Sequence, residues 1–179
     1  MIVTEPAPPE AAFVRAPDEA WCVCHARPRC EKKFAALMCA EQMVHYLPLV
    51  ESVRDYEGRI RRYAKPLFPG YVFTRVPNDR KNRIYQQDLL ARVLTVHDEP
   101  AFLRQLGDVQ RIVSSGLETT LHPLLKKGVL VRIISGPLRG LEGVIDNPDN
   151  PRGIVLAVDV LQQGLLVRVP MTHLKPLPR

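Results

Sequence analysis

The sequence predicts an α+β protein with two domains, an α/β sandwich with a mostly antiparallel sheet and a small C-terminal β-barrel. Up to residue 117, two amphipathic helical patterns alternate with short strand patterns. From Gly128 only strand patterns remain, and about 50 residues with four or five short strands fit a small barrel better than a sandwich. We therefore predict a disordered Pro/Ala/Glu-rich leader over residues 1–19, a sandwich over 20–117, a linker over 118–127 and a barrel over 128–179.

The sandwich is predicted to begin with a strand over residues 21–26, followed by a helix that starts at Pro28, where the missing N–H costs little. One face of this helix is an apolar stripe with helical spacing, formed by Cys30, Phe34, Leu37 and Met38. Residues 49–64 are predicted to form a hairpin that turns at Glu57-Gly58. Its tip is basic, with Arg54, Arg59, Arg61, Arg62 and then Lys65. A solvated hairpin that only aids solubility is the alternative interpretation.

The rest of the sandwich follows a break at residues 66–70. Strands are predicted over 71–76 and 92–96, with a short helix from Asn78-Asp79 through Gln87 between them. A second amphipathic helix over 100–116 ends at Gly116, which suits a helix C-terminus. The barrel strands are expected over residues 128–134, 141–146, 153–160 and 165–170.

Composition limits the class of protein. The chain has 179 residues, of which 46% are hydrophobic, so it can bury a core in one medium or two small domains. No apolar run approaches the roughly 20 residues needed to cross a bilayer. Residues 1–19 lack the basic and apolar regions of a signal peptide. We expect a cytoplasmic protein with no membrane partner.

The charge is positive but unevenly distributed. The formal net charge is +6 and the pI about 9.4. Residues 1–20 carry one basic and four acidic side chains, whereas residues 21–65 carry nine basic and five acidic ones. A basic folded part suits weak, salt-sensitive contact with nucleic acid. Many unrelated proteins are equally basic, so charge alone does not decide the function.

The four cysteines, Cys22, Cys24, Cys30 and Cys39, cluster near the start of the chain beside His25. Cys22 and Cys24 lie in a predicted strand and Cys30 and Cys39 in a helical pattern, not in the paired turns typical of zinc sites. We predict buried, reduced thiols without a metal or cofactor, with a thiol or metal enzyme as the alternative.

No catalytic motif accompanies these cysteines. The five histidines are scattered, and residues 136–140 join two predicted strands, so no helix N-terminus is available there to bind a phosphate. We therefore predict that the protein is not an enzyme.

Two motifs are more specific than composition. The first is Leu67-Phe68-Pro69-Gly70-Tyr71-Val72-Phe73, and the second spans Val129 to Ile145 and contains Gly136-Pro137-Leu138-Arg139-Gly140. In this order the two motifs resemble the NusG-like transcription factors, which have an NGN domain followed by an SH3-like KOW barrel. The resemblance extends from about Trp21 to Pro176. The KOW motif is the less specific of the two, because ribosomal proteins also carry it.

The resemblance implies a binding partner. The NGN domain of this family docks on the clamp helices of the largest catalytic subunit of RNA polymerase and suppresses pausing and termination. The residues that match its docking patch are Leu67, Phe68, Pro69, Tyr71 and Phe73. The residue pattern alone instead favours a core position for Tyr71 and Phe73, whose side chains share one face of a strand.

The resemblance also implies contact with DNA of the transcription bubble, either the upstream duplex or the displaced non-template strand. The candidate residues are Arg27, Lys32, Lys33, Arg59, Arg61 and Arg62. The KOW domain is expected to recruit a second factor, such as termination factor Rho or a small-subunit ribosomal protein. The protein would then be bacterial and nucleoid-associated through RNA polymerase.

The form of the C-terminal motif favours a specialised RfaH-like antiterminator. A housekeeping NusG-type factor and an RNA-binding, ribosome-associated KOW protein remain alternatives. Some family members refold the KOW domain as a helical hairpin. Here Pro137, Pro148, Pro151 and Pro170 would interrupt long helices, so we predict a stable barrel.

Overall fold

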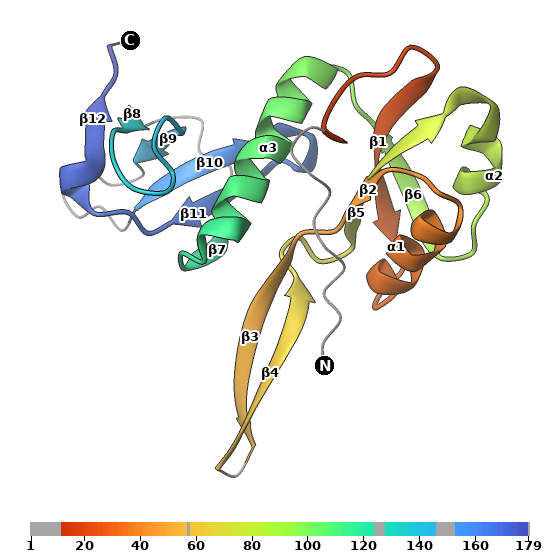
Figure 1. Ribbon diagram of the computed structural model, residues 1–179, viewed down its shortest axis with the longest axis horizontal. Helices are drawn as coiled ribbons and strands as arrows, with labels where there is room; N and C mark the ends of the chain where they lie inside the picture. The colour runs from red at the N-terminus through yellow and green to blue at the C-terminus, as the bar shows by residue number, and fades with distance from the viewer. Residues whose placement is uncertain (1–11, 57, 124–127, 146–152, 179) are drawn as a thin grey trace. The chain divides into compact units, whose positions relative to one another are not determined.

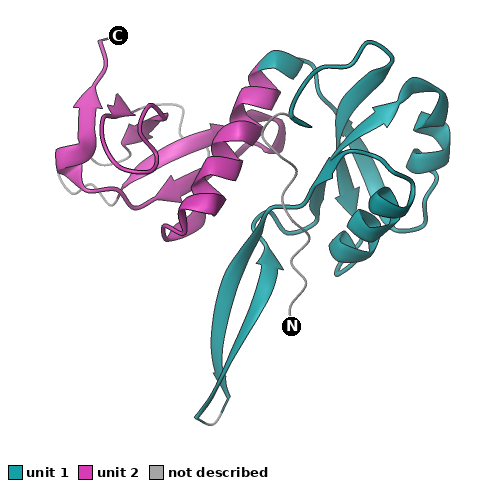
Figure 2. Ribbon diagram, in the orientation of Figure 1, with its two compact units in different colours: residues 1–100 teal, residues 101–179 magenta. Residues whose placement is uncertain are grey.

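The computed structural model describes residues 12–56, 58–123, 128–145 and 153–178 (Figure 1). The chain divides into two compact units, residues 1–100 and 101–179 (Figure 2). Each unit is described by itself. Among the described residues, no helix has the length and apolar character needed to span a bilayer.

The first unit is built on a four-stranded antiparallel sheet with the strand order β2-β5-β1-β6 (Figure 1). The strands are β1 (Glu19–Ala26), β2 (His45–Tyr46), β5 (Tyr71–Pro77) and β6 (Leu90–Thr95). Two helices accompany the sheet, α1 (Glu31–Ala40) and α2 (Lys81–Tyr85), the second preceded by a 3-10 turn over Asn78–Arg80. The predicted elements of this region are present, and their bounds shift by a few residues.

Alternation along β1 and β5 gives the sheet two different faces. One face presents Cys22 and Cys24 and packs against the apolar stripe of α1, represented by Phe34 and Met38. The other face is aromatic. Phe13 contacts Trp21 and Tyr46 with ring centroids 5.9 and 5.4 Å apart, and Phe73 contacts Tyr46 and Phe68 at 6.3 and 6.0 Å.

Some residues of the predicted leader, which covers residues 1–19, have packed side chains in the structure. Residues 1–11 lie outside the described residues. Phe13 is buried, and the Trp21 indole N–H donates to the carbonyl of Val14 at 3.1 Å. Phe13 and Val14, which the sequence placed in the leader, therefore pack on the first unit.

Strands β3 (Leu49–Tyr56) and β4 (Arg59–Pro66) form a separate two-stranded sheet that projects away from the four-stranded sheet of the first unit (Figure 1). The hairpin pairs Leu49 with Pro66 at its base and Tyr56 with Arg59 at its tip. Gly58 has φ of 81°, and its N–H donates to Asp55 Oδ1 at 2.8 Å. Glycine at this left-handed position allows the short turn.

The second unit contains an antiparallel six-stranded sheet with the order β12-β8-β9-β10-β11-β7. Its strands are β7 (Thr119–Pro123), β8 (Val129–Ile133), β9 (Glu142–Ile145), β10 (Ile154–Val158), β11 (Gln163–Val167) and β12 (Leu174–Pro176). Short 3-10 turns occupy Asp159–Leu161 and Met171–His173. The predicted fold class, α+β with mostly antiparallel sheets and a small C-terminal β domain, is confirmed.

The unit boundary differs from the predicted domain boundary at residue 117. It falls in the first turn of α3 (Glu99–Ser115), so nearly all of this helix belongs to the second unit. Gln105 Nε2 donates to Asp159 Oδ2 at 2.6 Å, and the Asp159 N–H donates to Gln105 Oε1 at 3.1 Å. The predicted linker over 118–127 also contains β7, which pairs with β11; residues 124–127 lie outside the described residues.

Candidate nucleic-acid and protein interface

Residues 67–70 connect β4 to β5, and together with the first three residues of β5 they form the segment called here the 67–73 turn. The Leu67 N–H donates to the Pro48 carbonyl at 2.8 Å, and the Tyr71 N–H to the Phe68 carbonyl at 3.1 Å. Gly70 is the centre of the turn. Its N–H donates to Glu31 Oε1 at 2.8 Å, and its carbonyl accepts from the Ala26 N–H at 2.7 Å. The turn is thus attached to both α1 and β1.

Gly70 cannot easily be replaced. Its φ of 86° lies in the left-handed region, and a Cβ at this position would lie 3.0 Å from the His25 imidazole. The same imidazole stacks on the Tyr71 ring, with centroids 4.8 Å apart and the planes inclined by 22°. His25 and Tyr71 are direct partners in the β1–β5 pairing, so the sheet register brings the two rings together.

The structure corrects the exposure that the resemblance implied for this turn. Leu67, Phe68 and Phe73 are buried, with exposed fractions of 4%, 0% and 0%. Phe73 lies on the aromatic face of the sheet, as the residue pattern alone predicted. Pro69 is exposed and Tyr71 half-buried, so these two side chains are the part of the turn that a partner can reach.

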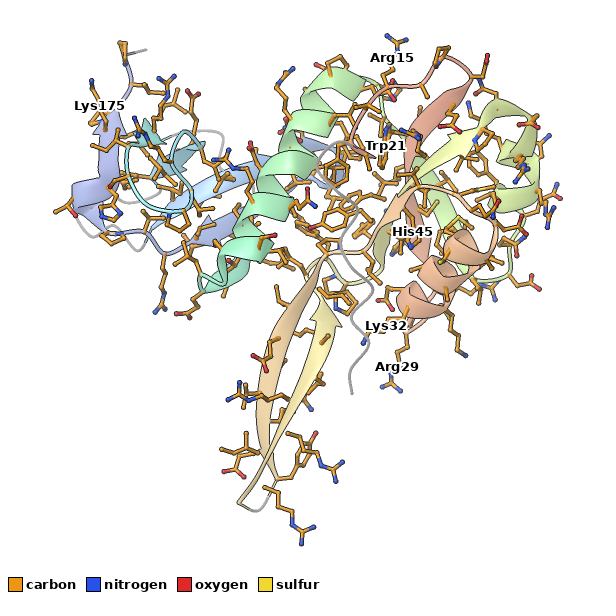
Figure 3. The ribbon with its side chains drawn as sticks, in the orientation of Figure 1. Arg15, Trp21, Arg29, Lys32, His45 and Lys175 are labelled. Atoms are coloured by element: carbon orange, nitrogen blue, oxygen red, sulfur yellow. The ribbon has the colours of Figure 1, made fainter. Side chains whose placement is uncertain are left out.

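Basic side chains gather where β1 leads into α1. Arg27, Lys32 and Lys33 are exposed, as a phosphate contact requires. Lys32 also donates from Nζ to the Ala64 carbonyl at 2.8 Å, which links α1 to the hairpin. Arg29 was not predicted as a candidate. It is exposed, with φ of 63°, and its side chain lies at the same end of α1 as that of Lys32 (Figure 3).

The hairpin is divided into two chemically different faces, because directly paired residues project to the same side. The basic face consists of Val50, Ser52, Arg54, Tyr56, Arg59, Arg61, Tyr63 and Lys65. The mixed face consists of Glu51, Val53, Asp55, Ile60, Arg62 and Ala64. The predicted site residues Arg59 and Arg61 therefore share a face. Arg62 lies on the other face, where its Nη1 is 3.4 Å from Glu51 Oε1.

Sequence reasoning did not select the tyrosines of the basic face. Tyr56 is 51% exposed. The Arg54 guanidinium carbon lies 5.6 Å from the centroid of the Tyr63 ring, and Ser52 Oγ donates to Tyr63 Oη at 3.0 Å. This hydrogen bond and the positive charges of Arg54 and Lys65 lower the pKa of Tyr63. The sequence contains a signal for this face, because every second residue counted outward from the predicted turn at Glu57-Gly58 belongs to it.

The cysteines separate into a buried pair and two that are more accessible. Cys22 Sγ and Cys24 Sγ lie 3.9 Å apart, and each is within 3.3 Å of Thr74 Oγ1. The hydrogen bond with Cys22 and burial raise the pKa of the Cys24 thiol. Cys30 is half-buried. Cys39 is exposed, contrary to prediction, because it follows Met38 on the side of α1 away from the sheet.

Within the described ranges, no cluster of three or more His, Cys, Asp or Glu side chains is arranged to hold a metal ion. Residues 136–140 form the turn between β8 and β9, where the Gly140 N–H donates to the Ile133 carbonyl at 2.7 Å. The glycines of this motif thus serve a strand connection.

The second unit exposes apolar side chains next to β8. Val131 and Ile133 are buried, whereas Leu130 and Ile134 on the opposite side of the strand are 39% and 45% exposed. Met171 in the turn before β12 is 45% exposed. Arg132 lies between Leu130 and Ile134 and donates from Nε to Glu142 Oε1 at 2.8 Å.

A search of curated proteins gives no match. Among solved structures, a chain of "Crystal Structure of MjSpt4:Spt5 complex conformation B" is 16% identical, with a TM-score of 0.31, and the match covers 89% of this chain and 97% of that chain. The family model described as "Transcription termination factor nusG" matches residues 19–130, more than half of the chain, from the first residue of β1 into β8. The chain therefore belongs to the NusG family of transcription elongation factors.

Proposed function

We propose that this protein binds the clamp helices of RNA polymerase through its first unit, suppresses pausing and termination, and recruits a second factor through its C-terminal unit. The observation that carries the proposal is the family match over residues 19–130, which includes the whole 67–73 turn and the hairpin. NusG-family factors are non-enzymatic regulators, and we assign the chain no cofactor.

The 67–73 turn supplies the polymerase contact. Tyr71 and Pro69 are the accessible side chains, whereas Phe68 and Phe73 are buried and contact each other. Aromatic side chains are enriched among the residues that dominate binding energy at interfaces, and Tyr71 is the partly exposed aromatic side chain of this turn. A factor that binds the closed clamp more tightly than the open clamp shifts the polymerase toward the closed, processive state.

The basic side chains supply the DNA contact. Arg27, Lys33, Arg59 and Arg61 are exposed and can neutralise phosphates, which requires positive charge but no base recognition. Arg62 contributes less, because Glu51 lies beside it. Such contacts keep the factor near the transcription bubble without selecting a sequence.

The second unit supplies the recruiting surface. Leu130, Ile134 and Met171 are exposed apolar side chains that suit a protein partner such as Rho or a small-subunit ribosomal protein. We further propose a specialised, RfaH-like antiterminator that acts in the bacterial cytoplasm with RNA polymerase. This assignment rests on the form of the glycine-rich motif over residues 136–143.

Co-elution with core RNA polymerase from the protein's own host tests the docking contact. Tyr71→Ala is the test variant, and Tyr85→Ala is the matched control, because Tyr85 is 41% exposed on another element of the same unit. We expect wild type and Tyr85→Ala to co-elute and Tyr71→Ala to be lost, with circular dichroism unchanged. Equal co-elution of folded Tyr71→Ala would rule out the turn as the docking site, and failure of the wild type would rule out polymerase docking.

A further inference from the structure

The basic face of the hairpin alternates rings and charges in successive rows. From the tip to the base, the paired rows are Tyr56 with Arg59, Arg54 with Arg61, and Ser52 with Tyr63. Lys65 follows in the next row. At a rise of about 3.4 Å per residue, the two tyrosine rows are about 14 Å apart, with the arginine row midway. The rings therefore lie on both sides of a doubly charged centre.

The arginine row is unfavourable for the isolated hairpin. Arg54 and Arg61 are directly paired across the strands, and like charges in that position destabilise a hairpin. The basic face has four basic and no acidic side chains among its described residues, whereas the mixed face has Glu51 and Asp55 beside Arg62. An anionic ligand on the basic face would relieve this repulsion. The repulsion therefore indicates a partner with negative charge.

The tyrosines indicate which kind of anionic partner fits the basic face. Phosphates alone would need only the charges, and a duplex keeps the faces of its bases stacked inside the helix. Unpaired bases can stack on aromatic rings, and the combination of a basic track with interleaved aromatic side chains is typical of surfaces that bind single strands. The half-exposed ring of Tyr56 at the tip is accessible for this contact.

We propose that the basic face of the hairpin is a stacking platform for a single DNA strand, in which Tyr56 and Tyr63 contact bases and Arg54, Arg59, Arg61 and Lys65 contact phosphates. This inference rests on the proposed function, which brings the protein to the displaced strand of the transcription bubble. It selects that strand over the upstream duplex.

The adjacent residues Arg61 and Arg62 provide a matched test, because they have the same charge and strand but lie on opposite faces. Fluorescence anisotropy of the full chain, without polymerase, measures binding to labelled oligothymidylate of about 12 nucleotides, a length within the range of single-strand sites. We expect Arg61→Gln to weaken binding several-fold. The slope of log K against log salt should become shallower by about 0.7, the value for one phosphate contact on a single strand. Arg62→Gln should weaken binding clearly less than Arg61→Gln, because Arg62 lies on the mixed face beside Glu51.

The tyrosines are tested in the same assay. Tyr56→Ala should weaken oligothymidylate binding by about fivefold or more, the effect of losing one stacked base. Tyr56→Phe should retain wild-type affinity because it keeps the ring. Ile60→Ala on the mixed face, where Ile60 is 68% exposed, controls for the loss of an exposed apolar side chain. Wild type should bind the single strand more tightly than a duplex of equal length.

Four results would overturn the inference. Two concern variants: Arg61→Gln and Arg62→Gln weakening oligothymidylate binding equally, or Tyr56→Ala leaving it unchanged. Two concern the ligand bound by wild type: a duplex binding as tightly as the single strand, or oligouridylate binding more tightly than oligothymidylate. A fifth would assign the face to an acidic protein surface: Arg61→Gln abolishing co-elution with DNA-free polymerase while oligothymidylate binding is unchanged. Tyr71→Ala should keep full DNA binding, so failure of polymerase docking and failure of the platform are distinguishable.

Discussion

Glu31 in the first turn of α1 accepts a hydrogen bond at 2.8 Å from the backbone N–H of Gly70 in the 67–73 turn. The contact joins residues far apart in the sequence and attaches the turn that presents Tyr71 to a helix that packs on the sheet. We expect Glu31→Ala to lower the free energy of unfolding by about 1–2 kcal/mol, because it removes a charged acceptor and a favourable charge at a helix N-terminus. Glu31→Gln keeps an acceptor oxygen and should lose less. Urea denaturation measures both, and an unchanged midpoint for Glu31→Ala would contradict the contact.

Gly70→Ala should destabilise the first unit for two separate reasons. The φ of 86° costs a non-glycine residue about 1–2 kcal/mol, and the new methyl group would lie 3.0 Å from the His25 ring. Gly58→Ala is the control, because Gly58 has a similar φ of 81° and a methyl group there would meet no atom within 4 Å among the described residues. Denaturation should show a larger loss for Gly70→Ala. Equal losses would mean that the imidazole moves aside freely.

Tyr46→Phe should stabilise the protein. The Tyr46 hydroxyl oxygen is buried, and no hydrogen-bond partner for it lies among the described residues. Removing an unsatisfied buried polar group while keeping the ring should raise the free energy of unfolding by about 1 kcal/mol. Thermal unfolding at neutral pH measures the effect, and a lower melting temperature for Tyr46→Phe would show that the hydroxyl has a partner.

The same hydroxyl predicts a dependence of stability on pH. Burial raises the pKa of Tyr46 above its ordinary value of 10.0. The unfolded chain therefore releases the Tyr46 proton first, so the contribution of this group to stability is full below pH 10 and is lost as the pH rises above 10 toward the raised pKa. Urea midpoints at increasing pH should fall less steeply for Tyr46→Phe than for wild type. Parallel slopes would contradict this assignment.

Thiol accessibility distinguishes the buried pair from the other cysteines. In the native protein we expect fast reaction of Cys39 with an aromatic disulfide reagent, slower reaction of Cys30, and protection of Cys22 and Cys24 until unfolding. Cys39→Ser should remove the fast phase, and all four thiols should react in denaturant. Fast modification of Cys22 in Cys39→Ser would favour the thiol-enzyme alternative.

The sequence predicts local structure better than long-range assembly. The predicted turn at Glu57-Gly58 sets the hairpin register, so the two faces follow from alternation alone. The apolar face of α3 predicts that Phe102 and Leu106 are buried. An amphipathic pattern does not show to which unit the helix belongs. Strand β7 was missed because it is an edge strand, short and only partly buried, whose partner β11 lies far along the chain. For Phe73, the residue pattern alone favoured a core position, and the side chain is buried.

The assignment of α3 and β7 to the second unit predicts that residues 128–179 alone lack part of their structure. β7 pairs with β11 along its whole length, with Thr119 opposite Val167 and Pro123 opposite Gln163. Gln105 also exchanges two hydrogen bonds with Asp159. A fragment over residues 99–179 should therefore unfold cooperatively at a higher temperature than one over 128–179, because the shorter fragment exposes the edge of β11. Gln105→Ala in the longer fragment should lower its stability by about 1–2 kcal/mol, because Asp159 loses both partners. Arg104→Ala on the exposed side of the same helix is the control. Identical melting of the two fragments would place α3 and β7 with the first unit, as the sequence alone predicted for the helix.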